Sequence, residues 1–473
     1  MTSFLIALAV LIGGYFIYGA LMEKVFGVDP KRTMPAYDKT DGVDFIPMPT
    51  WKVFLIQFLN IAGLGPIFGA IMGIMFGPAA FLWIVLGTIF AGGVHDFLSA
   101  MMSIRSGGDS LPEIAGRELG SSLKNVMRVF SVALLILVGA VFVITPSQLL
   151  AGMTPDFMTD KVWIAIIFAY YIAATLLPID KVIGNFYPIF GFALLFMAAG
   201  LLGVLIFGDV VIPDGFSDGL ASRYADASHP IFPMMFVTIA CGAISGFHAT
   251  QSPMMARCLK NERLARPVFY GAMVAEGIVA LIWAAAAIAF TGGYDGMFAY
   301  VAEHGNSASA DMVKDISVSW LGAAGGVLAI LGVVAAPITT GDTALRSARL
   351  MTADMLRVDQ KKLFKRVLMS LPIFALAFVL MLIDFSVLWR YFAWCNQTLA
   401  VFTLWAITIY LARHRRAYVV TLLPAIFMTA VSVTYLLFAP EGFSLPWGRS
   451  VGIGSAAAVM LTLLFFLAGR KAR

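Results

Sequence analysis

The sequence predicts an all-α, polytopic membrane protein built around two five-helix repeats of opposite orientation. Three observations lead to this fold class. Hydrophobic residues make up 60% of the 473 residues, charged residues only 12%, and the mean hydropathy is +0.89. Apolar runs of about 20 residues, each long enough to cross the hydrocarbon core of a bilayer, recur along the whole chain. Two of these runs are interrupted halfway by glycine together with proline or serine.

We expect about 13 transmembrane helices, one before the repeats and two after them. In chain order they lie at roughly 3–22, 51–77, 79–104, 125–149, 161–179, 184–207, 231–258, 266–290, 318–341, 366–384, 388–412, 418–438 and 447–468. The chain then divides into an N-terminal extra helix with a cytoplasmic loop (1–50), a first repeat (51–207), an external loop (208–230), a second, inverted repeat (231–412) and two C-terminal helices (413–473). The first helix has no basic segment before it, unlike a signal peptide, so we expect it to be retained.

The basic residues set the orientation of the chain. If the N-terminus lies outside, the outer side holds only five of the 32 Lys and Arg, and the other 27 lie on the inner side. The outer five are Lys161, Arg223, Lys314, Arg390 and Arg449. Cytoplasmic connections carry an excess of Lys and Arg, so this distribution predicts an outside N-terminus and a cytoplasmic C-terminus in the cytoplasmic membrane.

Several classes of protein are excluded or disfavoured by composition. The pI near 9 comes from loop charges that set orientation, so no nucleic-acid partner is expected. Cys241, Cys258 and Cys395 are odd in number and form no CxxC pair, which indicates neither a disulfide framework nor a metal site. No GxxxxGK[ST] segment occurs, so ATP is not expected as the energy source. We expect no cofactor. The sequence leaves the oligomeric state open.

The two interrupted spans are "WKVFLIQFLNIAGLGPIFGAIMGIMFG" at 51–77 and the run around "ACGAISGFHATQSP" at 240–253. Proline removes a backbone donor and glycine leaves helical geometry at little cost, so both helices should break near the membrane midplane. Broken backbone is tolerated at that depth only in a protein interior or a cavity. The two spans run in opposite directions, and four further spans follow each. This is the pattern of an inverted-repeat secondary transporter, whose site forms at the breaks. Kinked helices without a function are the alternative for either break alone.

Each break should leave a second half-helix whose positive N-terminal end, near Pro66 or near Ser245 to Phe247, points at the midplane. An anionic carboxylate would bind favourably there. Ser245 is a possible N-cap residue for the second half-helix. Amides in the neighbouring spans could bind substrate or could bond helices to one another. The candidate substrate-binding residues are Gln57, Asn60, Gly63, Gly65, Gly242, Ser245, Gly246, His248, Asn396 and Gln397.

Ionisable residues inside apolar spans are the candidates for ion or proton coupling, because they are costly there and usually face a cavity. Asp96 could carry a proton or could pair with Arg105. Glu276 could take part in a proton relay or could pair with an arginine of another helix. Asp342 is spaced to pair with Arg346 at i,i+4. The remaining candidates are Thr339, Thr340 and Lys181, and each also has a purely structural interpretation.

Five blocks of the sequence resemble the carbon starvation protein A (CstA) family. They are "GLGPIFGAIMG", "HDFLSAMMSIRSGGDSLPEIAGRELG", "ACGAISGFHATQSPMMARC", "PITTGDTALRSARL" and "FAWCNQTLAVFTLW", in this order, between about residues 50 and 412. The resemblance implies a LeuT-type fold related to the amino acid–polyamine–organocation transporters, and import of peptides or pyruvate when carbon is scarce. It also implies a bacterial inner membrane. In LeuT-type folds the helix that corresponds to 318–341 gives two adjacent hydroxyls to a sodium ion, which implies that role for Thr339 and Thr340. A proton-coupled member could place a lysine there instead, as Lys181. This sequence is shorter than the longer family members, and "ATQSPMMARC" replaces their Thr-Pro-Lys type run.

From residues and resemblance together we expect a secondary active transporter that imports a small carboxylate-bearing nutrient, coupled to H⁺ or Na⁺, by alternating access. The alternative is a membrane enzyme or a nutrient sensor on the same helical bundle. An enzyme would need a nucleophile–base pair or a motif such as HExxH, and a sensor would usually carry a soluble output domain. Neither is visible in the sequence.

Overall fold

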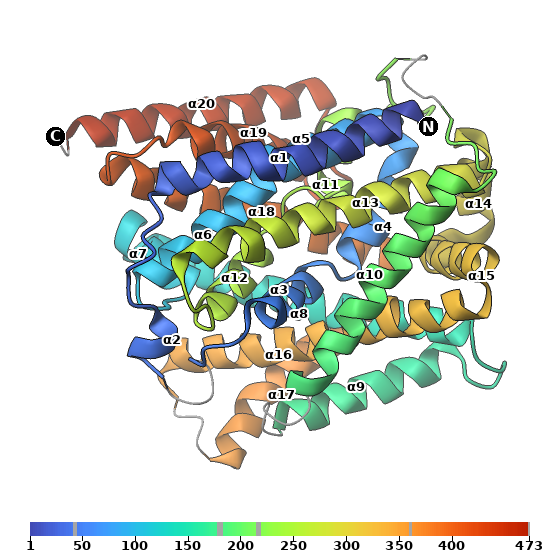
Figure 1. Ribbon diagram of the computed structural model, residues 1–473, viewed down its shortest axis with the longest axis horizontal. Helices are drawn as coiled ribbons and strands as arrows, with labels where there is room; N and C mark the ends of the chain where they lie inside the picture. The colour runs from blue at the N-terminus through green and yellow to red at the C-terminus, as the bar shows by residue number, and fades with distance from the viewer. Residues whose placement is uncertain (41–44, 177–182, 214–218, 359–361, 472–473) are drawn as a thin grey trace.

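The computed structural model describes residues 1–40, 45–176, 183–213, 219–358 and 362–471, and every regular element in these ranges is helical. Most of the long helices run roughly parallel or antiparallel in one bundle, and the two termini lie at opposite ends of it (Figure 1). Ten helices in the described ranges are long and apolar enough to cross a membrane, or eleven if one bent pair counts as a single span. The chain is therefore a multi-pass membrane protein, as predicted.

Most elements coincide with predicted spans, but helical structure at the predicted span 318–341 begins earlier and continues to Leu356. The peripheral helices at the two ends of the chain are α1 (Thr2–Phe26), α19 (Val419–Phe438) and α20 (Trp447–Lys471). The helices between them that bear on the site are α5 (Ala79–Gly87), α6 (Gly93–Arg105), α7 (Leu111–Leu119), α8 (Ser121–Ala151), α9 (Asp160–Leu176), α10 (Ile183–Phe207), α13 (Gly271–Phe290), α16 (Ala335–Leu356), α17 (Leu363–Leu380) and α18 (Phe385–Arg413).

The first predicted break is present. Helix α3 (Thr50–Ile61) ends at Ala62, and α4 (Gly65–Gly73) starts three residues later at an angle of 46° to it. Pro66 lies in the first turn of α4, where its missing N–H would have no helical partner in any case. A short 3₁₀ turn, Ile74–Phe76, completes this span. The prediction of an interrupted helix here is confirmed.

The second predicted break is also present and is longer. Helical structure at 231–238 stops at Ile239, whose φ and ψ of −92° and 60° leave the helical region. Helix α12 (His248–Ala256) starts nine residues later. The side chains at 239–248 are buried, so this irregular backbone lies in the protein interior, as such backbone must at membrane depth.

Several helical features were not expected from the sequence, among them α7 in the connection after the span 79–104. The segment 291–317 is largely helical, with α14 (Tyr294–His304) and the start of α15 (Ala308–Ala329), where we expected only a loop. Helix α15 contains a kink at Gly322, whose φ of 62° suits glycine. A π-helical stretch (Thr88–Gly92) joins α5 to α6, and such stretches are frequent at functional sites. Apolar periodicity does not reveal these features.

Candidate functional site

The two interrupted segments lie directly against each other. A Cβ atom added to Gly65 would come within 2.2 Å of Cβ of Cys241, and one added to Gly69 within 2.8 Å of the carbonyl oxygen of Thr238. Gly73 faces Ile239 in the same way. These three glycines are spaced four residues apart on α4, so they form one face against the second segment. The small residues bring two backbones together that are more than 160 residues apart in sequence.

Hydrogen bonds from α18 hold the second break in place. The side-chain oxygen of Asn396 accepts from the backbone N–H of Phe247 (2.7 Å) and from the hydroxyl of Ser245 (3.0 Å), and its NH₂ group lies 3.1 Å from Sγ of Cys241. Gln397 donates to the carbonyl oxygens of Phe236 (3.2 Å) and Ile244 (3.3 Å). Buried backbone groups need such partners when no helix supplies them. Of the two uses predicted for these amides, the structure shows the bonding of segments to one another.

The side of the break away from α18 is held by α5 and the π-helical stretch. Thr88 donates its hydroxyl to the carbonyl oxygen of Gly242 (3.0 Å), and Nε1 of Trp83 donates to that of Ile239 (3.2 Å). Gly246 approaches α18 so closely that an added Cβ would lie 2.3 Å from the carbonyl oxygen of Asn396. The glycines proposed from sequence to bind substrate therefore have close packing as their visible use, and a binding role remains a prediction.

The predicted N-cap at Ser245 is wrong. Helix α12 begins at His248, the capping position is Phe247, and no side chain accepts from the first turn as a cap. Ser245 lies two residues earlier and bonds Asn396 instead. The N–H of Phe247 is bound by a side chain from another helix, which the local sequence could not indicate.

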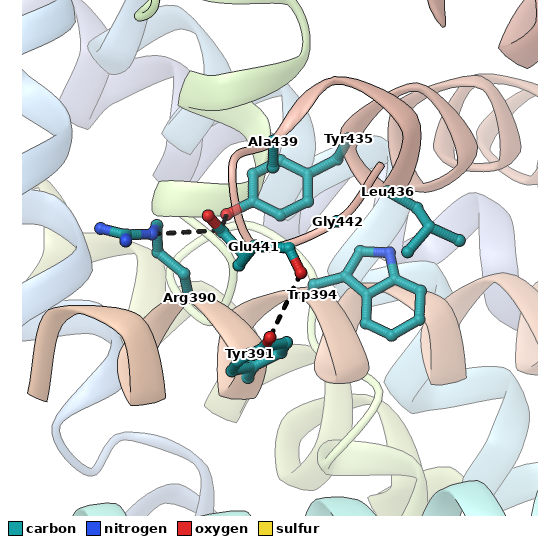
Figure 2. Close-up of a pocket in the computed structure, with 8 residues that line it drawn as sticks. All are labelled: Arg390, Tyr391, Trp394, Tyr435, Leu436, Ala439, Glu441 and Gly442. Atoms are coloured by element: carbon teal, nitrogen blue, oxygen red, sulfur yellow. Dashed lines mark hydrogen bonds and ion pairs between the residues drawn. The ribbon is translucent and has the colours of Figure 1, made fainter. Parts of the chain in front are cut away.

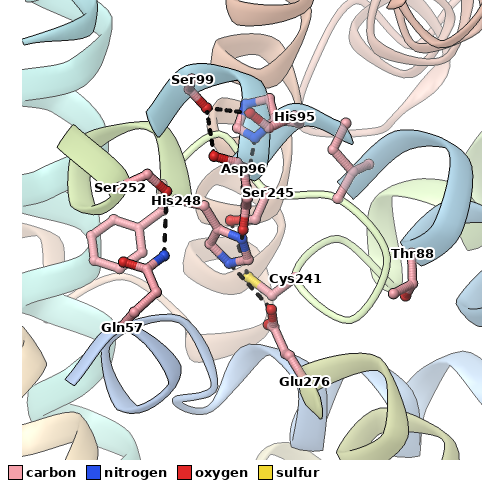
Figure 3. Close-up of polar contacts among 12 residues, drawn as sticks. Gln57, Thr88, His95, Asp96, Ser99, Cys241, Ser245, His248, Ser252 and Glu276 are labelled. Carbon is pink, nitrogen blue, oxygen red and sulfur yellow. Dashed lines mark hydrogen bonds and ion pairs between the residues drawn. The ribbon is translucent and has the colours of Figure 1, made fainter. Parts of the chain in front are cut away.

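Four ionisable side chains from three helices meet beside this break (Figure 3). The carboxylate of Asp96 on α6 lies 2.7 Å from Nδ1 of its neighbour His95 and 2.9 Å from Nδ1 of His248. The other ring nitrogen of His248, Nε2, lies 3.5 Å from Oε2 of Glu276 on α13. All four side chains are 0% exposed. We refer to His95, Asp96, His248 and Glu276 as the buried acid–histidine cluster.

The partners within this cluster differ from those expected. Asp96 does not pair with Arg105, because the guanidinium of Arg105 binds Glu262 with two hydrogen bonds of 2.7 and 2.8 Å. Glu276 does not pair with an arginine; within the described ranges its ion pair is with His248. His95 was missed as a candidate, although its position directly before an intramembrane aspartate was a signal in the sequence.

The amide side chain of Gln57 on α3 lies beside the cluster (Figure 3). Gln57 donates to the hydroxyl of Ser252 on α12 at 3.3 Å, and its own carbonyl oxygen has no hydrogen-bond partner in the described part of the chain. The same holds for the side-chain oxygens of Asn60 and Gln251. Buried polar atoms without partners are uncommon and call for an explanation, for which a bound molecule is a good candidate. Ser252 was not predicted, although it lies one helical turn after His248.

The other described coupling candidates make their observed contacts within α16. The hydroxyls of Thr339 and Thr340 both donate to the carbonyl oxygen of Ala336 within α16. Asp342 pairs with Arg346 at 3.3 Å, which confirms the predicted i,i+4 contact. Lys181 lies outside the described residues. The structure thus brings Asp96 and Glu276 together with His248, while Asp342 pairs within its own helix.

A separate small cavity lies between the start of α18 and the end of α19 (Figure 2). Its lining includes Glu441, which accepts from Arg390 (3.1 Å) and Tyr435 (2.5 Å). The volume of about 30 Å³ has room for a water molecule or two and not for a nutrient. Since this cavity is too small for a nutrient and is lined by an ion pair, we assign it no transport role.

Comparison with known proteins places this geometry in context. The chain shares its fold with a mutant form of the manganese transporter of Eremococcus coleocola, with a TM-score of 0.58, 11% identity and coverage of 91% of this chain and 99% of that one. It is 45% identical over 338 residues to an uncharacterized membrane protein of Haemophilus influenzae, covering 61% of this chain and 91% of that protein.

Two further relatives have named activities. The peptide transporter CstA of Campylobacter jejuni is 28% identical over 335 residues (57% of this chain, 47% of that protein), and the pyruvate/proton symporter BtsT of Escherichia coli is 28% identical over 329 residues (57% and 46%). The chain therefore spans about half the length of these transporters. The family model for carbon starvation protein CstA matches residues 1–159 and 151–321. The chain belongs to the carbon starvation protein CstA family.

Proposed function

We propose that this protein is an ion-coupled secondary active transporter that imports a small carboxylate-bearing nutrient, pyruvate or a short peptide, by alternating access. The observation that carries the proposal is the contact between two interrupted helices in the protein interior, at Gly65 and Cys241. Interrupted helices at membrane depth form substrate and ion sites in transporters of this kind. The names of the relatives supply the two candidate substrate classes.

The substrate site in this proposal lies between α3 and α12, next to the breaks. Gln57 and Asn60 contribute carbonyl oxygens that have no partner among the described residues, and these suit the N–H groups of a peptide. The N-terminal ends of α4 and α12 favour the carboxylate, which pyruvate and peptides share. His248, the first residue of α12, is in position to sense the charge of a bound substrate.

Counterflow in proteoliposomes tests the proposal. Purified protein is reconstituted into liposomes loaded with unlabelled pyruvate or dialanine, and entry of the labelled form of the same compound is followed. We expect entry of one class well above that into protein-free liposomes. A membrane enzyme or sensor would give no entry of either compound, and that result would refute the proposal.

Two variants test the placement of the site. Gln57→Leu and Asn60→Leu remove the free carbonyl oxygens while keeping similar volume, and each should raise KM about fivefold, which corresponds to roughly 1 kcal/mol. Glu303→Gln on the exposed surface of α14 serves as the control. Unchanged kinetics in both leucine variants would place the substrate elsewhere, while transport itself would remain established by the counterflow result.

A further inference from the structure

His248 lies between two carboxyl groups in a geometry suited to proton transfer. Its Nδ1 faces Oδ2 of Asp96 at 2.9 Å, and its Nε2 faces Oε2 of Glu276 at 3.5 Å. The three side chains come from α6, α12 and α13, so three separate helices supply one line of groups. Figure 3 shows the imidazole between the two acids. We propose that Asp96, His248 and Glu276 form the proton-binding site that couples proton flow to substrate import; this rests on the transport function proposed above.

The chemistry of the line favours a proton over a metal cation. A sodium or other hard cation needs several oxygen ligands converging on one point. Here the space between the two carboxyl groups is filled by a ring whose two nitrogens each face an acid. An imidazole can accept a proton at one nitrogen and release one from the other, and it changes charge near physiological pH.

Charge balance requires protons in the cluster. Two carboxylates and two histidines are fully buried, and within the described ranges neither acid has a lysine or arginine as an ion-pair partner. An unbalanced charge in such an environment is costly. One protonated histidine balances only one of the two carboxylates, so a second proton is needed, either on the other histidine or on Glu276. Both oxygens of Glu276 lack a hydrogen bond among the described residues, so no donor there stabilises the ionised form of this carboxyl group.

The titratable groups around Glu276 are few. His248 and Asp96 face it from α12 and α6, with His95 behind Asp96, and Cys241 lies near it in the second break. The buried parts of α3 and α4, which pack against α13, contain no charged residue. Arg266, in the short helical segment that precedes α13, pairs with Glu23 of α1 instead. The cluster is therefore separate from the other ion pairs described here.

The proton step is conservative in atoms and charge. The carboxyl O–H of protonated Glu276 gives its proton to Nε2 of neutral His248, while Nδ1–H of the same ring gives its proton to the carboxylate of Asp96. Glu276 ends as a carboxylate, Asp96 as a carboxylic acid, and the ring is neutral in its other tautomer. The Nε2 to Oε2 distance of 3.5 Å must shorten to about 3 Å for this transfer.

The same histidine connects the proton to the helix break. His248 is the first residue of α12, and the segment before it carries Cys241, which contacts Gly65 of the first interrupted helix. A change of charge on His248 therefore acts at the joint between the two interrupted helices. Substrate, helix N-terminus and proton would meet within one buried region, as coupling requires.

Coupling and transport are separated by two assays on the same proteoliposomes. Accumulation of labelled pyruvate or dialanine driven by a pH gradient needs the proton, whereas counterflow of the same compound does not. We expect Glu276→Gln and Asp96→Asn each to lower pH-driven accumulation at least about tenfold and to lower counterflow no more than about threefold. The proton influx that accompanies substrate in the wild-type protein should be lost in both variants. Glu303→Gln makes the same chemical change outside the cluster and should alter neither assay.

Each other outcome overturns the inference. Equal loss of both assays in variants that elute as folded protein would give the cluster a structural or substrate-binding role. Unchanged accumulation would remove it from coupling. Wild-type accumulation driven by a sodium gradient and not by a pH gradient would refute the proton while leaving the proposed transport function intact.

A measurement without substrate keeps the inference testable if neither compound is carried. Infrared difference spectra of wild-type protein between about pH 5 and 9 should contain a band of a buried carboxylic acid that is missing in Glu276→Gln. Counterflow would then have refuted the proposed function, and the spectra would decide on proton binding separately. Identical spectra of the wild type and Glu276→Gln would overturn the proton site.

Discussion

Gly65→Ala should push the two interrupted helices apart. The added Cβ would lie 2.2 Å from Cβ and 2.4 Å from Sγ of Cys241, whereas carbon atoms in contact prefer about 3.5 to 4.0 Å. The backbone of one segment must therefore move by roughly 1 Å or more, since these atoms sit on or next to main chain. Overpacking of this kind typically costs about 1–3 kcal/mol. We expect a lower thermal unfolding temperature in detergent and strongly reduced counterflow.

A double variant isolates the contact. Cys241→Gly removes both colliding atoms. Gly65→Ala should therefore lower the stability of the Cys241→Gly variant much less than it lowers the stability of the wild-type protein. Gly203→Ala on α10 is the control, because nothing lies within 4 Å of its added Cβ and alanine favours the helix. If Gly65→Ala unfolded at the same temperature as the wild type, the two breaks would not touch as described, and the reasoning about the site would fail.

Three further changes test other parts of the structure. Glu262→Gln removes the charge that Arg105 binds with two hydrogen bonds and should destabilise the protein by about 2–3 kcal/mol, measured by thermal unfolding; no change would mean that this ion pair does not hold α6 in place. Partial burial raises the pKa of the Glu113 carboxyl group. Its ion pairs with Lys124 and Arg128 of α8 have the larger effect, so the pKa is lowered overall. The ion pairs of Glu113 thus stabilise the folded protein above the ordinary pKa of a glutamate, and this stabilisation is lost as pH falls. Acidification from pH 7 to about 4 should therefore lower the unfolding temperature of the wild type more than that of Glu113→Gln. Parallel plots of unfolding temperature against pH for the two proteins would contradict this. Asn396→Ala leaves the buried N–H of Phe247 and the hydroxyl of Ser245 unpaired, so it should lower the free energy of unfolding by about 2–4 kcal/mol and reduce counterflow. Counterflow at the wild-type rate in this variant would show that the break has no part in the mechanism.

Much of the fold could be predicted from the sequence because its cause is local. Apolar length places the spans, and Pro66 with its flanking glycines marks the first break within a few residues. The second break at 239–247 follows from the same kind of signal. The helices within 291–317 could not be predicted, since that segment mixes polar and apolar residues, and α14 and α15 pack against each other and against α13.

Three of the four members of the buried acid–histidine cluster could be singled out from the sequence, but His95 was missed and the pairings could not be predicted. Asp96, His248 and Glu276 stood out as costly groups inside apolar spans. Which of them meet depends on contacts between helices that are more than 150 residues apart for Asp96 and His248. Asp96 was expected to bind Arg105, which Glu262 binds instead. Asn396 and Gln397 could be recognised as important amides, but their role as supports of the broken backbone requires the three-dimensional arrangement.

The second interrupted segment is joined differently to its neighbours: Trp83 and Thr88 donate hydrogen bonds to its backbone, but in the described part of the chain no such bond joins it to α4. Hydrogen bonds also fasten it to Asn396 and Gln397, whereas it meets α4 through the smooth face of Gly65, Gly69 and Gly73. Directional bonds resist displacement, while apolar contact between small groups offers little resistance to shear. If the halves of the molecule shift during a transport cycle, slippage will occur along the glycine face, and 239–247 will move with the helices that are hydrogen-bonded to it.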